Sequence, residues 1–277
     1  MKPHRAVVLG PGGVPGTAWL LGLLTGLRRG GIDLAEADTV VGTSAGAIAG
    51  MLLGGDTDLA RPAPNPELES GPNRGDPNAM AQAHLLLGGS APTTDTRRQV
   101  GRIASTATAT PAHIWVARMR HLIGDVDWPA NLLVPAVDAD SGEPIVWRAG
   151  DGVPPASAVA AGTAAPGMAE PIPVGDRRYF DGAFRAGLNT DLVPPKARVI
   201  IAEPLGLRMG NAPVDTHPDV VRITADAAAD SAFGPDLSDR SRWQAAFEAG
   251  LRQSIEATPL IRRIWTLTTP VDADLVR

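Results

Sequence analysis

The fold is decided by the stretch Asp38-Thr39-Val40-Val41-Gly42-Thr43-Ser44-Ala45-Gly46, which runs on into small and apolar residues at 47–53. Its apolar first part predicts a buried strand, and the small residues after Ser44 predict a helix. Glycines two positions before and after the serine remove the Cβ atoms that would clash where strand meets helix. Such a turn lifts a serine hydroxyl into the open, so Ser44 is a candidate nucleophile.

The residues before this stretch follow the same strand–loop–helix pattern. The apolar run 5–9 predicts a buried strand, and 10–16 is a loop of glycine and proline. Trp19 and the leucines that follow it recur at helical spacing, and Gly30-Gly31 ends that helix. Two such units in succession are typical of a parallel sheet covered by helices.

The rest of the chain continues this organisation without an internal repeat or a linker. We therefore expect one domain over residues 1–277, with its core at about 5–205. The prolines and glycines of 54–78 predict a mobile loop. The other expected elements are helices near 79–87 and 96–122 (the second broken or kinked at Pro111), strands at 132–137 and 144–147 forming a hairpin, a helix at 156–165, a short strand ending at Asp181, strands at 199–202 and 220–223, and a C-terminal helix within 238–257 with Trp243, Phe247, Leu251 and Ile255 on one face.

Composition excludes several classes of function. Hydrophobic residues make up 44% of the chain and aromatic residues only 4%, so aliphatic side chains must build the core. The net charge of −5 argues against a nucleic-acid partner, which requires a basic face. The absence of cysteine excludes disulfides, thiolate metal sites and a cysteine nucleophile. Nothing in the pattern calls for a metal or a cofactor.

The N-terminal region resembles a signal peptide only superficially. Basic residues precede the apolar run 18–24, but the glycines and prolines of 10–16 break the first half of the region, and Asp33 and Glu36 lie next to the candidate cleavage site at 35–37. No apolar run approaches the roughly 20 residues that span a membrane. We expect a cytoplasmic protein that contacts a membrane surface at most transiently; the sequence does not reveal its oligomeric state.

The loop Gly10-Pro11-Gly12-Gly13-Val14-Pro15-Gly16 offers clustered backbone N–H groups to an anion. A dinucleotide fingerprint would need glycine at position 15, although Asp33 lies where a ribose-binding acid would be. A Walker loop is excluded because no Gly-Lys-Ser/Thr follows. Close packing alone is one alternative. The other is an oxyanion hole made by the N–H groups of Gly12 and Gly13; Pro11 has no N–H to donate.

Two residue types could activate the serine. Of the five histidines, only His217 follows a serine and an aspartate in the order typical of α/β-hydrolases, and its Thr-His-Pro-Asp setting is also that of an ordinary turn. The serine turn also comes too early for that fold, after a single preceding strand. The carboxylate candidate is Asp181 in Asp181-Gly182-Ala183, although Asp-Gly is a common turn dipeptide.

Four segments together resemble the patatin-like phospholipase family over residues 5–205. They are the loop 10–16, the turn 42–47, the small-residue run 160–167 and the segment 178–183. The resemblance implies a three-layer α/β/α fold with a mainly parallel central sheet. It also implies a Ser-Asp dyad of Ser44 and Asp181, and an oxyanion hole of Gly12 and Gly13 with the Ala45 N–H as a helper. The motif positions it assigns are Gly10, Gly16, Gly42, Gly46, Gly182 and Ala183.

The chain departs from the family pattern in the oxyanion loop. Pro11 replaces the first of three consecutive glycines, and Pro15 stands where the family commonly has arginine. Both glycines needed as donors remain, so the resemblance still implies activity. The prolines are the one sequence feature that favours an alternative, a catalytically silent relative that binds a lipid or acyl ligand.

The leading hypothesis is a serine acylhydrolase that cleaves carboxylic esters of lipids through an acyl-enzyme, as a phospholipase A, lipase or esterase. A nucleotide-binding oxidoreductase is a further alternative, weakened by Pro15. An aspartate with a reference pKa near 3.9 is a poor base for an alcohol. The hypothesis therefore requires a dry pocket around Asp181 and a serine Oγ within roughly 3.5 Å of its carboxylate.

Overall fold

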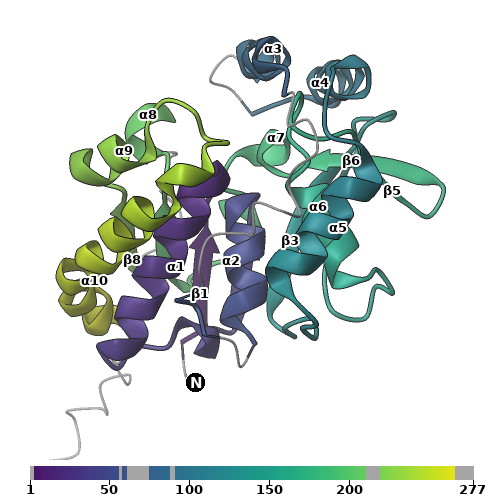
Figure 1. Cartoon of the computed structure of the whole chain (residues 1–277). Helices are drawn as coiled ribbons and strands as arrows, with labels where there is room; N and C mark the ends of the chain where they lie inside the picture. The colour runs from purple at the N-terminus through teal and green to yellow at the C-terminus, as the bar shows by residue number, and fades with distance from the viewer. Residues whose placement is uncertain (1–2, 56–57, 61–74, 88–90, 210–218, 266–277) are drawn as a thin grey trace, which may run out of the picture.

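The computed structural model describes residues 3–55, 58–60, 75–87, 91–209 and 219–265 (Figure 1). Its strands are β1 (Arg5–Leu9), β2 (Thr39–Gly42), β3 (Leu132–Asp138), β4 (Pro144–Trp147), β5 (Ile172–Val174), β6 (Arg177–Asp181), β7 (Arg198–Glu203) and β8 (Asp219–Thr224). Within the described residues they form one eight-stranded sheet in the order β5-β6-β3-β2-β1-β7-β8, and β4 pairs with β3 off this path.

The sheet has a parallel part and an antiparallel part. Strands β8, β7, β1, β2 and β3 pair in parallel, whereas β4 and β6 pair antiparallel with β3, and β5 with β6. Leu9 pairs with Gly42, so β1 and β2 end side by side. The loops that follow them therefore meet at one edge of the sheet, where parallel α/β proteins place their sites. The expected mainly parallel sheet is confirmed.

Helices flank the sheet on both faces, as the predicted three-layer α/β/α fold requires. They are α1 (Gly13–Arg29), α2 (Ala45–Leu53), α3 (Pro77–Leu87), α4 (Thr94–Thr106), α5 (Ala112–Ile123), α6 (Pro155–Gly162), α7 (Ala183–Ala186), α8 (Gly206–Met209), α9 (Ala227–Phe233) and α10 (Trp243–Trp265). Figure 1 shows α10, α1, α2 and α5 side by side across one face, and neighbours in this row are in contact. Helices α3, α4 and α7 pack instead with Val137 of β3 and Phe180 of β6, which face the opposite way from Ala136. None of the described helices is long and apolar enough to cross a membrane.

Strand β1 is buried on both of its faces. Val7 and Leu9 belong to the main core under the helices, whereas Ala6 and Val8 pack with residues of 188–201 on the opposite side. Continuous burial explains why this strand is apolar without alternation. It also fixes the end of β1, from which the glycine loop begins.

Several expected boundaries are wrong. Helix α1 begins at Gly13 rather than after Gly16, because a proline in the first turn forfeits no intrahelical hydrogen bond. The expected break of helix 96–122 at Pro111 is confirmed: the segment forms two helices, α4 and α5, and Pro111 is the N-cap of the second. The expected helix 156–165 ends at Gly162, and β5 was not expected. Most of the expected mobile loop lies outside the described residues, and its last two positions already belong to α3.

The C-terminal helix differs most from expectation. It extends through Pro259 to Trp265, and a 3₁₀ turn at Arg240–Arg242 precedes it. Ile255, expected on the buried face, is 74% exposed. The buried face instead carries small residues such as Ala246 and Gly250. A Cβ at Gly250 would overlap the Trp19 carbonyl oxygen, so α10 packs on α1 by close backbone approach.

Candidate active site

Ser44 occupies a strained turn between β2 and α2. Its φ of 53° and ψ of −116° lie where residues with a side chain are rare. The flanking glycines make this turn possible: a Cβ at Gly42 would lie 2.6 Å from the Gly46 carbonyl oxygen, and one at Gly46 would overlap the Leu9 carbonyl oxygen. The turn is therefore pressed against the end of β1.

Asp181 lies at the end of β6, opposite Ala136 of β3, with only 2% of its surface exposed. Ser44 Oγ donates a hydrogen bond of 2.7 Å to its Oδ2, and the Ala183 N–H donates one of 2.8 Å to its Oδ1. In the part of the chain that the structure describes, no other side chain bonds to Ser44 Oγ. The two residues, 137 positions apart, thus meet the distance that the hypothesis requires.

Burial raises the pKa of Asp181 to about 6, while the hydrogen bonds from the Ala183 N–H and the Ser44 hydroxyl act to lower it. The carboxyl group is therefore mostly ionised at neutral pH and binds a proton more readily than an ordinary aspartate. A base of this kind is matched to proton transfer near neutrality.

The small-residue run near 160–167 supports the Asp181 loop through backbone hydrogen bonds. The N–H groups of Asp181 and Gly182 donate to the carbonyl oxygens of Ala164 and Gly162 at 3.1 and 3.3 Å. A Cβ at Gly182 would overlap the Pro135 carbonyl oxygen, so only glycine fits between this loop and β3. These contacts join the third and fourth sequence segments into one structural unit.

Three backbone N–H groups beside Ser44 are open. Within the described residues, those of Gly12, Gly13 and Ala45 meet no hydrogen-bond acceptor. They lie at the N-termini of α1 and α2, whose dipoles favour negative charge. The N–H groups of Gly10 and Gly16 are instead used internally, bonding to the carbonyl oxygens of Ala202 and Gly12.

Asn189 is a residue of the site that the sequence reasoning missed. It is fully buried, with a left-handed φ of 58°. Its Nδ2 donates to Thr43 Oγ1 at 3.0 Å and to the carbonyl oxygens of Gly182 and Gly187 at 3.1 Å. Its Oδ1 accepts from Arg185, which also pairs with Asp191. Asn189 therefore ties the turn before Ser44 to the loop after Asp181.

A cavity of about 1420 Å³ opens over Ser44 and Asp181. Gly12, Gly13 and Ala45 line it beside them, and His84 and His121 lie on its wall. His217 lies outside the described residues. Apolar side chains from several helices and loops line the remainder, among them Ile48, Trp115, Met119, Leu122, Met168 and Leu205. No group of three or more metal-ligating side chains occurs within residues 3–55, 58–60, 75–87, 91–209 and 219–265.

The family follows from comparison with known proteins. The model of the family described as patatin-like phospholipase matches residues 7–193, more than half of the chain. The chain belongs to the patatin-like phospholipase family. The family predicted from the four sequence segments is thereby confirmed, and with it the reaction class, hydrolysis of lipid esters.

Solved structures give more distant likenesses to this patatin-like chain. VipD from Legionella pneumophila matches with 13% identity and a TM-score of 0.45, over 94% of this chain and 67% of VipD. The type III effector protein ExoU matches with 16% identity and a TM-score of 0.38, over 96% of this chain and 54% of ExoU. The chain thus spans about half the length of ExoU. A search of curated proteins found no match.

Proposed function

We propose that this chain hydrolyses carboxylic esters of lipids through an acyl-enzyme formed on Ser44, with Asp181 as the base. The observation that carries the proposal is the 2.7 Å hydrogen bond from Ser44 Oγ to a buried carboxylate whose pKa is raised to about 6. Both groups border the large cavity, so a substrate carbonyl can reach them.

In the first half of the reaction, Ser44 Oγ attacks the ester carbonyl carbon while its proton passes to Asp181 Oδ2. The carbonyl oxygen becomes an oxyanion and accepts hydrogen bonds from the open N–H groups of Gly12, Gly13 and Ala45. One such donor can contribute about 3 kcal/mol of transition-state stabilisation. The ester C–O bond then breaks, and the alcohol leaves with the proton held by Asp181.

The second half regenerates the enzyme. A water molecule gives its proton to Asp181 while its oxygen attacks the acyl carbon, which forms a second oxyanion at the same N–H groups. The bond between the acyl carbon and Ser44 Oγ breaks, and Ser44 recovers the proton from Asp181. The fatty acid is the second product.

The size and lining of the cavity support a lipid rather than a small polar ester. Pockets for small molecules are usually about 300–1,000 Å³. The cavity of about 1420 Å³ exceeds this range and is lined largely by apolar side chains. We infer that its aliphatic and aromatic wall, which includes Ile48, Trp115 and Met119, receives the acyl chain.

The alternative is a silent relative that binds a lipid without turnover, for which the prolines of the glycine loop are the argument. Their positions favour the hydrolase instead. Pro15 lies in the first turn of α1, where an N–H has no intrahelical acceptor, and Pro11 precedes both proposed donors. Neither proline removes an N–H group from Gly12 or Gly13.

A fluorophosphonate probe separates the two functions because it labels only an activated serine. We expect the wild-type protein to be labelled and Ser44→Ala to be unlabelled. Ser241 provides a matched control, since its Oγ also donates to an aspartate, Asp239, at 2.6 Å, but in an exposed local turn. Ser241→Ala should be labelled like the wild type. An unlabelled wild-type protein that is folded and binds a fatty acid would reject hydrolysis in favour of the silent binder.

A further inference from the structure

Large apolar side chains are exposed on two helices at one end of the molecule. Four of the six such residues within the described ranges lie on α3 and α8, and the other two lie on α10. The six are Leu85 (79% exposed), Leu86 (37%), Leu207 (59%), Met209 (54%), Ile255 (74%) and Leu260 (46%). Exposing single leucines is ordinary, but their concentration on two helices of a lipid-hydrolase fold is not explained by packing.

Both helices wall the cavity that holds Ser44. Helix α3 contributes Met80 and His84 to its lining, and α8 contributes Arg208 and Met209. His84, Arg208 and Met209 are also exposed to solvent, so they mark where the cavity opens. Figure 1 shows α3 and α8 at the end of the molecule where α1 begins, the end that also carries the serine turn.

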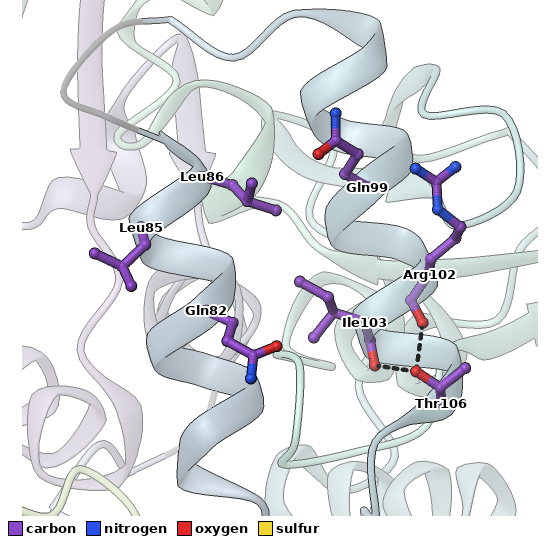
Figure 2. Close-up of a pocket in the computed structure, with 7 residues that line it drawn as sticks. All are labelled: Gln82, Leu85, Leu86, Gln99, Arg102, Ile103 and Thr106. Atoms are coloured by element: carbon purple, nitrogen blue, oxygen red, sulfur yellow. Dashed lines mark hydrogen bonds between the residues drawn. The ribbon is translucent and has the colours of Figure 1, made fainter.

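The neighbourhood of the α3 leucines is amphipathic. A hollow of about 480 Å³ separates α3 from α4, and Figure 2 shows Leu86 directed toward α4 while Leu85 points away from it. Arg102 on α4 borders the same hollow, is exposed, and forms no ion pair with a carboxylate in the described part of the chain. The exposed leucines of α3 can enter the acyl-chain region of a bilayer while Arg102 meets the phosphate head groups above it.

We propose that α3 and α8 dock on a phospholipid bilayer with Leu85 and Leu207 inserted, so that the cavity opens onto the membrane that supplies the ester. The inference rests on the proposed function. A fluid bilayer accepts side chains from two separate helices on either side of an opening, whereas a protein partner would need one continuous surface. The net charge of −5 makes long-range attraction to anionic lipid weak, so apolar insertion carries the binding.

The test compares two double variants that each replace two exposed apolar residues by serine. Leu85→Ser/Leu207→Ser alters the proposed docking face without changing a residue that lines the cavity. Ile255→Ser/Leu260→Ser makes the same change on α10, which contributes neither residue to the cavity. Partition onto vesicles of phosphatidylcholine and phosphatidylglycerol is measured by sedimentation. We expect the partition coefficient onto vesicles to fall by about tenfold or more for the first variant and to stay at the wild-type value for the second.

A second measurement keeps this inference separate from the proposed function. The docking-face variant should hydrolyse vesicle phospholipid more slowly by a similar factor, yet hydrolyse a soluble nitrophenyl ester at the wild-type rate. If the wild-type protein binds vesicles but hydrolyses neither the phospholipid nor the soluble ester, the result counts against the proposed Ser44 chemistry and not against docking. Docking is overturned if wild-type protein does not sediment with vesicles or if both double variants partition equally. A dimer that only Leu85→Ser/Leu207→Ser dissociates would assign the face to a second copy instead.

Discussion

The parallel and antiparallel parts of the sheet each contribute one residue to the proposed pair of Ser44 and Asp181, and they position these residues in different ways. Ser44, from the parallel part, is placed by backbone strain in a turn that glycines press against β1. Asp181, from β6, is placed by burial and by hydrogen bonds to its carboxylate. A strained turn leaves a local sequence signature of glycines, whereas burial of an aspartate depends on residues far away in the chain. The first contribution is therefore readable from the local sequence, whereas Asp181 is identified only through the family resemblance.

The largest effect should come from removing the base. Asp181→Asn preserves the size of the side chain but cannot accept the serine proton, so we expect kcat to fall by about 10³–10⁴-fold. In the wild type, kcat/KM should rise with pH through about 6, because Asp181 must be ionised to act, and should level above that value. Hydrolysis of a soluble ester across pH 4 to 8 measures both quantities.

Asp138 is the matched control for this substitution. It is also a buried aspartate at the end of β3 next to β6, only 4% exposed, but its carboxylate bonds to Arg177 and to the backbone N–H groups of residues 140 and 141 rather than to Ser44. Asp138→Asn should keep wild-type kcat at temperatures where it is folded. A wild-type rate that stays level between about pH 4 and 8 would rule out Asp181 as the base.

The same two aspartates should have opposite effects on stability. Burial raises the pKa of Asp181 from 3.8 to about 6, so the folded state holds its proton to higher pH than the unfolded chain does. Above pH 6 the ionised carboxylate therefore destabilises the fold by up to ~3 kcal/mol. Asp181→Asn should raise the free energy of unfolding by up to that amount at pH 8, and by progressively less toward pH 4.

For Asp138 the sign is reversed. Burial alone would raise its pKa, but hydrogen bonds from Ser141 and Asp140 and from Arg177 outweigh it and hold the pKa below its ordinary value. Its ionised form therefore stabilises the fold at neutral pH, and this contribution is lost as pH falls through the lowered pKa. Asp138→Asn should lower the free energy of unfolding at pH 7 by about 1–3 kcal/mol. Urea unfolding at pH 5 and pH 8 checks both signs; equal shifts for the two variants would contradict the contrast.

The sequence predicts the parallel part of the sheet well because its strands are continuous apolar runs. The expected strands at 5–9, 132–137, 199–202 and 220–223 all correspond to strands of the structure. The edge strand β5 has only three residues, one of which is Pro173, so it lacks the continuous apolar run that would predict a strand. The face of α10 was misjudged for a different reason: its close packing on α1 uses small residues, and the larger Ile255 points outward.

The candidate site divides in a similar way. Ser44 and Asp181 could both be named from the sequence, and Gly12 and Gly13 could be placed in the same loop. The 2.7 Å contact, the raised pKa and the cavity depend on the packing of segments more than a hundred residues apart. Asn189 had no local signal that points to Thr43, because a left-handed asparagine resembles an ordinary turn residue.

Asn189 offers the finest test of the comparison, because its amide is the link between the two parts of the sheet. Asn189→Asp keeps the size of the side chain and tolerates the left-handed backbone, yet it removes the N–H donors to Thr43 Oγ1 and the Gly182 carbonyl oxygen. A misplacement of about 1 Å between reacting groups can cost roughly 10²-fold in rate. We expect kcat on a soluble ester to fall by about 10–100-fold with KM nearly unchanged.

Asn131 controls for the loss of an amide in general. Its Nδ2 donates to the carbonyl oxygens of Ala35 and Ala37, and neither acceptor bonds to Ser44 or Asp181. Asn131→Asp should therefore lower stability without changing kcat. Because Asn189→Asp adds a negative charge near the Asp181 loop, a positioning role further requires that the midpoint of the pH–rate profile not fall below about 6. If Asn189→Asp instead lowered only the free energy of unfolding, as Asn131→Asp should, the amide would be a structural link and the alignment of Ser44 with Asp181 would rest on the strained turn alone.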